Sequence, residues 1–162
     1  MTNMFRRIFV IPLLLLGGTA CSNESDLQHK SNLPNVSEKK EEGVMEEMKI
    51  KLSVHNEELI VKMNDNSTSR DFLELLPLTL TFKDYARKEK VSNPPRQLSE
   101  EGAPSGIEPR VGDVTYYAPW GNLAIFYEDF SYSSGLIKLG EVESGLESIP
   151  KLQGEVRVER LE

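Results

Sequence analysis

Short runs in which apolar and polar residues alternate constrain the fold of this chain more than any other feature. Residues 48–54 read Met-Lys-Ile-Lys-Leu-Ser-Val, and residues 59–63 resume the alternation after a polar turn. A period of two is typical of a strand with one buried face, because successive side chains of a strand point to opposite sides. The two runs therefore predict a β-hairpin.

More strand candidates follow along the rest of the chain. Further strands are predicted in five segments: 78–82, 113–118, 123–127, 136–142 and 155–161. The runs at 113–118 and 123–127 flank the turn Pro-Trp-Gly-Asn and predict a second hairpin. About seven strands with few helices favour a β-barrel or a β-sandwich over a layered parallel sheet.

Two short helices and one long loop are expected between these strands. Thr68 or Ser69 is a suitable cap for a helix over residues 70–76, which Pro77 would end. Ser144 is a suitable cap for a helical turn through Ile149, limited by Pro150. The polar, proline-rich stretch 83–111 predicts a loop, and long loops in compact domains are often functional.

The first 20 residues have the composition of an export signal. Arg6 and Arg7 precede an apolar run over residues 8–16, and small residues follow it. The stretch 8–20 would reach only ~20 Å as a helix, whereas a bilayer core is ~30 Å thick. We therefore expect a cleaved signal peptide rather than a permanent transmembrane helix.

Cys21 is the only cysteine in the chain, so an intramolecular disulfide is excluded. The segment Gly-Thr-Ala-Cys at 18–21 resembles the bacterial lipobox. The resemblance implies that Cys21 carries a diacylglyceryl group, becomes the new N-terminus and anchors the protein to a membrane on its extracytoplasmic face. Each buried CH₂ of an acyl chain contributes ~0.8 kcal/mol to such anchoring. An ordinary secreted protein with a free thiol is the alternative.

The composition divides the chain into three parts. After the signal peptide at 1–20, residues 21–47 are rich in Ser, Asn, Glu and Lys and show no sustained apolar period, which predicts a flexible tether behind the lipidated cysteine. Residues 48–162 have the length of one domain. The net charge of −7 and the lack of a basic patch argue against a nucleic-acid partner.

The sequence contains no motif for a metal or a cofactor, and we expect neither. Its two histidines, His29 and His55, are isolated, and no glycine-rich phosphate-binding motif is present.

An aromatic cluster surrounds the second predicted hairpin. Alternation sends Tyr116 and Tyr117 to opposite faces, so at most one of them lines a core. One interpretation is a barrel core with a packed loop. The other is an aromatic-walled groove for a peptide or small molecule, for which the candidate residues are Arg70, Tyr85, Tyr117 and Trp120.

Several long segments resemble the cyclophilin-like fold, and more narrowly a bacterial subgroup of small cyclophilin-like domains. They are residues 68–80, 82–86, 112–127 and 139–147, and the resemblance covers essentially the whole predicted domain. It implies a closed β-barrel with a short helix capping each end.

The resemblance does not extend to the catalytic motif of cyclophilins. Those enzymes are peptidyl-prolyl isomerases whose site centres on the arginine of a Phe-His-Arg motif. The corresponding residues 78–85 read Leu-Thr-Leu-Thr-Phe-Lys-Asp-Tyr, without arginine or histidine, and the Gln-Gly-Gly stretch is missing. We therefore expect a non-catalytic binding domain. The alternative is an extracytoplasmic isomerase that uses a non-standard arginine, for which the candidates are Arg70, Arg87, Arg96 and Arg110.

Overall fold

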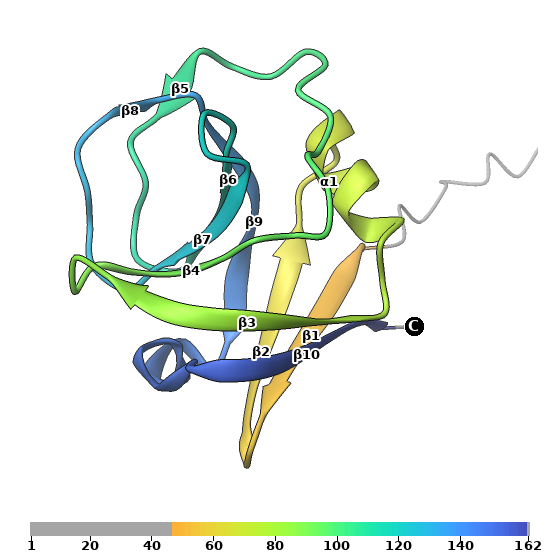
Figure 1. Ribbon diagram of the computed structural model, residues 1–162, viewed down its shortest axis with the longest axis vertical. Helices are drawn as coiled ribbons and strands as arrows, with labels where there is room; N and C mark the ends of the chain where they lie inside the picture. Colours follow the sequence, from red (N-terminus) through yellow and green to blue (C-terminus); the bar gives the residue numbers. More distant parts are fainter. Residues whose placement is uncertain (1–46, 162) are drawn as a thin grey trace, which may run out of the picture. The chain divides into compact units, whose positions relative to one another are not determined.

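Eight antiparallel strands close into a barrel in a computed structural model that describes residues 47–161 (Figure 1). The signal peptide, Cys21 and all but the last residue of the predicted tether lie outside these residues. The strands are β1 (Lys49–Val54), β2 (Glu57–Met63), β3 (Leu78–Tyr85), β4 (Glu89–Ser92), β5 (Gly106–Ile107), β6 (Asp113–Tyr117), β7 (Asn122–Phe126), β8 (Ser133–Ser134), β9 (Leu136–Ser144) and β10 (Gly154–Leu161).

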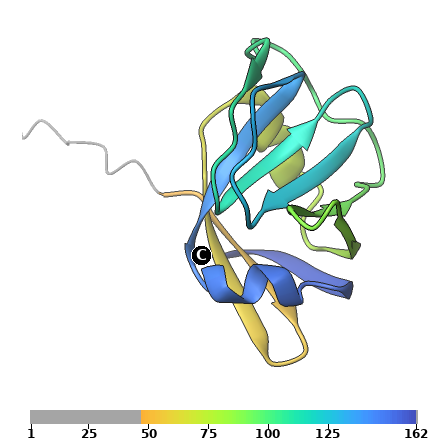
Figure 2. The same ribbon diagram turned by 90° about the vertical axis from the view of Figure 1, so that its left-hand side faces the viewer.

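The barrel order is β1-β10-β3-β4-β7-β6-β9-β2, and β5 pairs with β8 in a separate two-stranded sheet. All seven predicted strands are confirmed, and of the two architectures the structure selects the barrel. The β1–β2 hairpin projects beyond the rest of the barrel at its lower end, as the view turned by 90° also shows (Figure 2).

Alternate residues of the strands fill the barrel. In β1, Ile50, Leu52 and Val54 are buried, whereas the residues between them are partly exposed. In β10, Val156 and Val158 are buried in the same way. Because a register slip by one residue would turn these side chains to solvent, the apolar pattern specifies the strand pairing.

The first helix, α1 (Ser67–Leu73), begins three residues before its predicted start. Its cap is Asn66 rather than Thr68 or Ser69, because the Asn66 side chain accepts a hydrogen bond from the Ser69 backbone N–H at 2.9 Å. Figure 1 shows α1 toward the upper end of the barrel.

The second helix, η1 (Leu146–Lys151), is a 3₁₀ helix toward the lower end of the barrel. The predicted cap Ser144 is wrong, because Ser144 is still the last residue of β9 and the cap position falls on Gly145. Gly145 has φ 85°, a left-handed value that favours glycine. Pro150 lies inside the helix instead of ending it. Neither helix in this part of the chain is long and apolar enough to cross a membrane.

The prediction that residues 83–111 form one loop is wrong, because this stretch contains the end of β3, all of β4 and the two-residue strand β5. Strand β3 continues to Tyr85, and the chain turns back through Ala86 and Arg87, which both have positive φ, 53° and 55°. The Lys88 N–H closes the turn on the Tyr85 carbonyl at 3.1 Å. Strand β4 then lies between β3 and β7 and completes the barrel wall.

Candidate functional site

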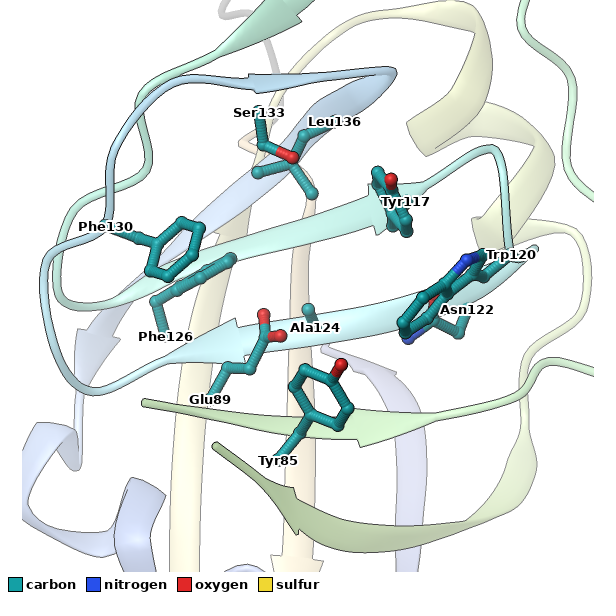
Figure 3. Close-up of a pocket in the computed structure, with 10 residues that line it drawn as sticks. All are labelled: Tyr85, Glu89, Tyr117, Trp120, Asn122, Ala124, Phe126, Phe130, Ser133 and Leu136. Carbon is teal, nitrogen blue, oxygen red and sulfur yellow. The ribbon is translucent and has the colours of Figure 1, made fainter. Parts of the chain in front are cut away.

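A pocket of about 150 Å³ opens on the outer wall of the barrel. It lies over β4, β7, β6 and β9, and a segment between β7 and β9 borders it (Figure 3). Its lining residues are Tyr85, Glu89, Tyr117, Trp120, Asn122, Ala124, Phe126, Phe130, Ser133 and Leu136.

Strand β7 forms the floor of the pocket and is buried on both faces. Leu123 and Ile125 point into the barrel core, so the alternate residues Asn122, Ala124 and Phe126 point outward into the pocket. Ala124 is the smallest of these side chains and leaves room above the strand. The outward face of β7 therefore lines the pocket and is not part of the barrel core.

The segment after β7 holds one side of the pocket in place. The Phe130 N–H donates to the Pro109 carbonyl at 3.2 Å, and its ring lies 6.3 Å from the ring of Phe126. The short pairing of β5 with β8 brings Ile107 against a small apolar cluster outside the barrel core, which consists of Val91, Ala124, Phe126 and Leu136. These contacts join residues that are far apart in the sequence.

Three of the four candidate groove residues lie together at the side of the pocket opposite Phe130. They are Tyr85, Tyr117 and Trp120. The Trp120 ring is 5.5 Å from that of Tyr117 and 5.8 Å from that of Tyr85, both edge to face. Trp120 is 64% exposed, so it is a wall of the pocket and not part of the core. Tyr116, by contrast, is fully buried, in agreement with the predicted division of the two tyrosines between opposite faces.

Arg70, the fourth candidate, does not line this pocket. It lies on α1, is exposed, and its guanidinium forms an ion pair with the Asp65 carboxylate. Because that charge is already paired within its own segment, the expectation that Arg70 supplies a polar group to the pocket is not supported.

Two polar side chains that the sequence did not single out face into the pocket. Glu89 comes from β4 and is partly buried, and this burial raises the pKa of its carboxyl. Its carboxylate forms no ion pair with any residue between 47 and 161. Asn122 is 7% exposed, and its Oδ1 accepts no hydrogen bond within the same part of the chain. A buried acceptor without a donor costs about 1–3 kcal/mol.

Glu89 was missed because β4 was missed. A two-residue hairpin turn with two positive φ values usually contains Asn-Gly or Asp-Gly, and Ala-Arg gives no such signal. Asn122 was missed because it follows Gly121 at the end of a turn, and asparagine is common in turns without any role in binding.

A satisfied polar network stabilises the β3–β4 hairpin beside the pocket. The Lys90 ammonium is 3.0 Å from the Asp84 carboxylate, and the Tyr127 hydroxyl donates to that carboxylate at 2.6 Å. Tyr127 and Lys90 together hold the pKa of Asp84 below its usual value. Burial, with the hydrogen bond to Asp84, raises the pKa of Tyr127 to about 12. Each group has a partner, so the network positions the hairpin that carries Tyr85 and Glu89.

The pocket contains few groups that could act as a nucleophile or hold a metal ion. Ser133, its only hydroxyl besides the two tyrosines, has no hydrogen-bonded base among the described residues. Within residues 47–161, no three His, Cys, Asp or Glu side chains are arranged to hold a metal ion.

Comparison with known proteins agrees with this architecture. The sequence profile of the cyclophilin-like family matches residues 52–160. The chain belongs to the cyclophilin-like family. The solution structure of a hypothetical protein from Archaeoglobus fulgidus superposes with a TM-score of 0.56 at 18% sequence identity, over 71% of this chain and 95% of the archaeal one. At that identity, the likeness to the archaeal protein concerns the fold alone. A search of curated proteins found no match.

Proposed function

We propose that this protein is a membrane-anchored lipoprotein whose cyclophilin-like domain binds a peptide or a small molecule outside the cytoplasmic membrane. The observation that carries the binding role is the outer pocket, which joins five aromatic rings with two polar groups: the Glu89 carboxylate, which forms no ion pair in the described chain, and Asn122, whose Oδ1 accepts no hydrogen bond there. Apolar pockets with a few oriented polar groups are the usual form of ligand sites.

The exposure of the aromatic wall supports this role. Trp120 is 64% exposed and Tyr85 is 43% exposed, although burial of such rings is strongly favourable. Large rings on a surface are typical of sites that are covered by a partner.

The pocket does not favour the isomerase alternative. Weakening a prolyl amide bond requires a donor directed at the proline nitrogen, and no arginine is among the residues that line the pocket. Arg96 is paired with Asp71, and Arg110 lies 3.2 Å from Glu108. A coupled proline-isomerisation assay on the purified protein should therefore show no rate above the uncatalysed reaction.

The binding role is tested by filling the pocket. The mature lipidated chain in a neutral detergent is screened against peptides and small molecules, with the fluorescence of Trp120, the only tryptophan, as the signal. Ala124→Leu should abolish any response, because the added atoms occupy the floor of the pocket. Thr79→Leu, a similar enlargement at an exposed position of β3, is the matched control and should leave the response unchanged. A ligand that still changes Trp120 fluorescence in the Ala124→Leu variant would show that binding occurs outside this pocket.

The anchor is tested at Cys21. Cys21→Ser should release the protein from the membrane fraction or leave it unprocessed at a higher mass, because the acyl chains can no longer be attached. Membrane fractionation and mass spectrometry measure both outcomes. A Cys21→Ser protein that matures normally and stays with the membrane would exclude lipid anchoring at this position.

A further inference from the structure

A carboxylate without a partner lies at the centre of the pocket. Figure 3 shows the Glu89 side chain reaching from β4 into the space that the aromatic rings surround. Fourteen ion pairs occur among residues 47–161, and none of them includes Glu89. A carboxylate in apolar surroundings is unfavourable unless a positive charge or several donors accompany it.

The rings around Glu89 attract positive charge as well. Tyr85, Tyr117 and Trp120 stand on one side of the carboxylate, and Phe126 and Phe130 stand on the other (Figure 3). A cation over the face of an aromatic ring gains about 0.5–2 kcal/mol, with the larger value where water is excluded. The walls and the carboxylate therefore favour the same kind of ligand.

The amide of Asn122 adds a second requirement. Asn122 lines the pocket, and its Oδ1 is buried and receives no hydrogen bond from the described chain. A ligand that satisfies it must donate an N–H or O–H. A quaternary ammonium has a positive charge but no such hydrogen, so it would leave Asn122 Oδ1 without a hydrogen bond.

We propose that the pocket recognises an organic cation that carries N–H groups, an alkylammonium or a guanidinium on a short apolar body. The positive charge lies at the Glu89 carboxylate between the rings, and an N–H donates to Asn122 Oδ1. This inference rests on the proposed binding function and names its ligand class. The volume of about 150 Å³ equals that of an apolar cavity that holds benzene, so it accommodates the head group and a few carbons.

The same chemistry occurs in free amines and in the lysine and arginine side chains of peptides. The test uses both. The probes are butylammonium, butylguanidinium, the neutral alcohol 1-pentanol, butyltrimethylammonium, and the N-acetyl methylamides of lysine and arginine. The full mature chain in a neutral detergent is titrated with each probe, and Trp120 fluorescence reports binding.

Butylammonium or butylguanidinium, or one of the two amino-acid amides, should bind at least tenfold more tightly than 1-pentanol and more tightly than butyltrimethylammonium. Preference for the amides over the free amines would identify a peptide side chain as the source, and the reverse order would identify a small molecule. An alcohol that binds as well as the primary cations would overturn the inference, and so would the failure of every cationic probe to bind.

Two variants separate the two contacts. Glu89→Gln should weaken the binding of the primary cations at least tenfold and leave 1-pentanol unaffected, whereas Glu155→Gln, at an exposed position of β10, should change neither. Asn122→Ala should reduce the preference for butylammonium over butyltrimethylammonium.

If neutral peptides bind and Ala124→Leu blocks them while cations have no advantage, the ligand class is wrong and the binding function stands. If the pocket binds neither peptides nor small molecules, the binding function itself fails.

Discussion

Trp120 illustrates at the scale of one residue how position determines what an aromatic side chain does. It lies in the turn between β6 and β7, contacts two tyrosine rings edge to face and leaves most of its surface in water. Ile125, five residues later, is 1% exposed and points into the barrel core. The two side chains therefore contribute to stability by very different amounts.

Trp120→Ala should destabilise the domain by less than about 1 kcal/mol, because removing a mostly exposed ring leaves no sealed cavity. Ile125→Ala should cost about 2–5 kcal/mol, as is usual for a buried aliphatic side chain that is cut to alanine. Denaturant melts followed by circular dichroism measure both values. Iodide should quench Trp120 fluorescence in the parent protein, and equal losses of stability for the two variants would contradict the exposed position of the ring.

Glu89 should lower stability at neutral pH. Burial raises the pKa of its carboxyl in the folded chain above the usual value near 4.5, so folding favours the protonated form. The favourable contribution of Glu89 is thus fully present below that usual value and is lost as pH rises through the raised pKa. Glu89→Gln should therefore raise Tm at pH 7, and the gain should shrink below about pH 4.

Thermal melts of the parent and the Glu89→Gln variant at pH 7 and pH 4 measure this difference. A lower Tm for the variant at pH 7 would show that Glu89 has a stabilising partner. Glu89→Gln would thus stabilise the free protein and weaken the binding of the proposed ligand. Groups that are placed for binding often lower the stability of the free protein in this way.

At the scale of an element, one side chain, that of Asn66, both caps helix α1 and attaches it to the barrel wall. The side-chain Oδ1 of Asn66 accepts a hydrogen bond from the Ser69 N–H at 2.9 Å, and its side-chain Nδ2 donates to the Lys138 carbonyl of β9 at 3.0 Å. The same residue therefore begins the helix and attaches it to the barrel wall. With seven residues, α1 is too short to be stable without such contacts.

Asn66→Ala should cost about 1–2 kcal/mol of stability, the usual range for the loss of an N-cap. Urea unfolding curves of the two proteins measure the change. Asn56→Ala, at an exposed turn position between β1 and β2, is the control and should stay within about 0.5 kcal/mol. An equal effect of both substitutions would mean that Asn66 does not hold the helix.

At the scale of the whole molecule, the chain is predicted to consist of a lipid anchor, a tether and one domain. The Met63 N–H donates to the Met48 carbonyl at 2.8 Å, so the backbone of the domain is engaged from about residue 48. Limited proteolysis should cut between residues 22 and 47 and leave a resistant fragment that begins near Met48. Mass spectrometry identifies that fragment, and first cuts inside residues 48–162 would argue against this boundary.

The strands were predictable because their signal is local. The predicted strands are short runs that either alternate apolar and polar residues, as at 48–54, or are apolar throughout, as at 123–127, and residues close in the chain are enough to show either pattern. Strand β4 was not predictable in this way. Its residues Glu-Lys-Val-Ser include a lysine that is buried only because Asp84, on the neighbouring strand, pairs with it.

The sequence by itself thus determined the class of fold, the family, and the placement of Tyr116 and Tyr117 on opposite faces of a strand. Those properties depend on residues that are close in the chain. Only the tertiary structure decided that β4 closes the barrel, that Glu89 and Asn122 share one pocket, and that Arg70 stays outside it. The pocket joins β3, β4, the β6–β7 hairpin and the segment around Phe130, which no local pattern connects, because its shape arises from strand pairing between distant parts of the chain.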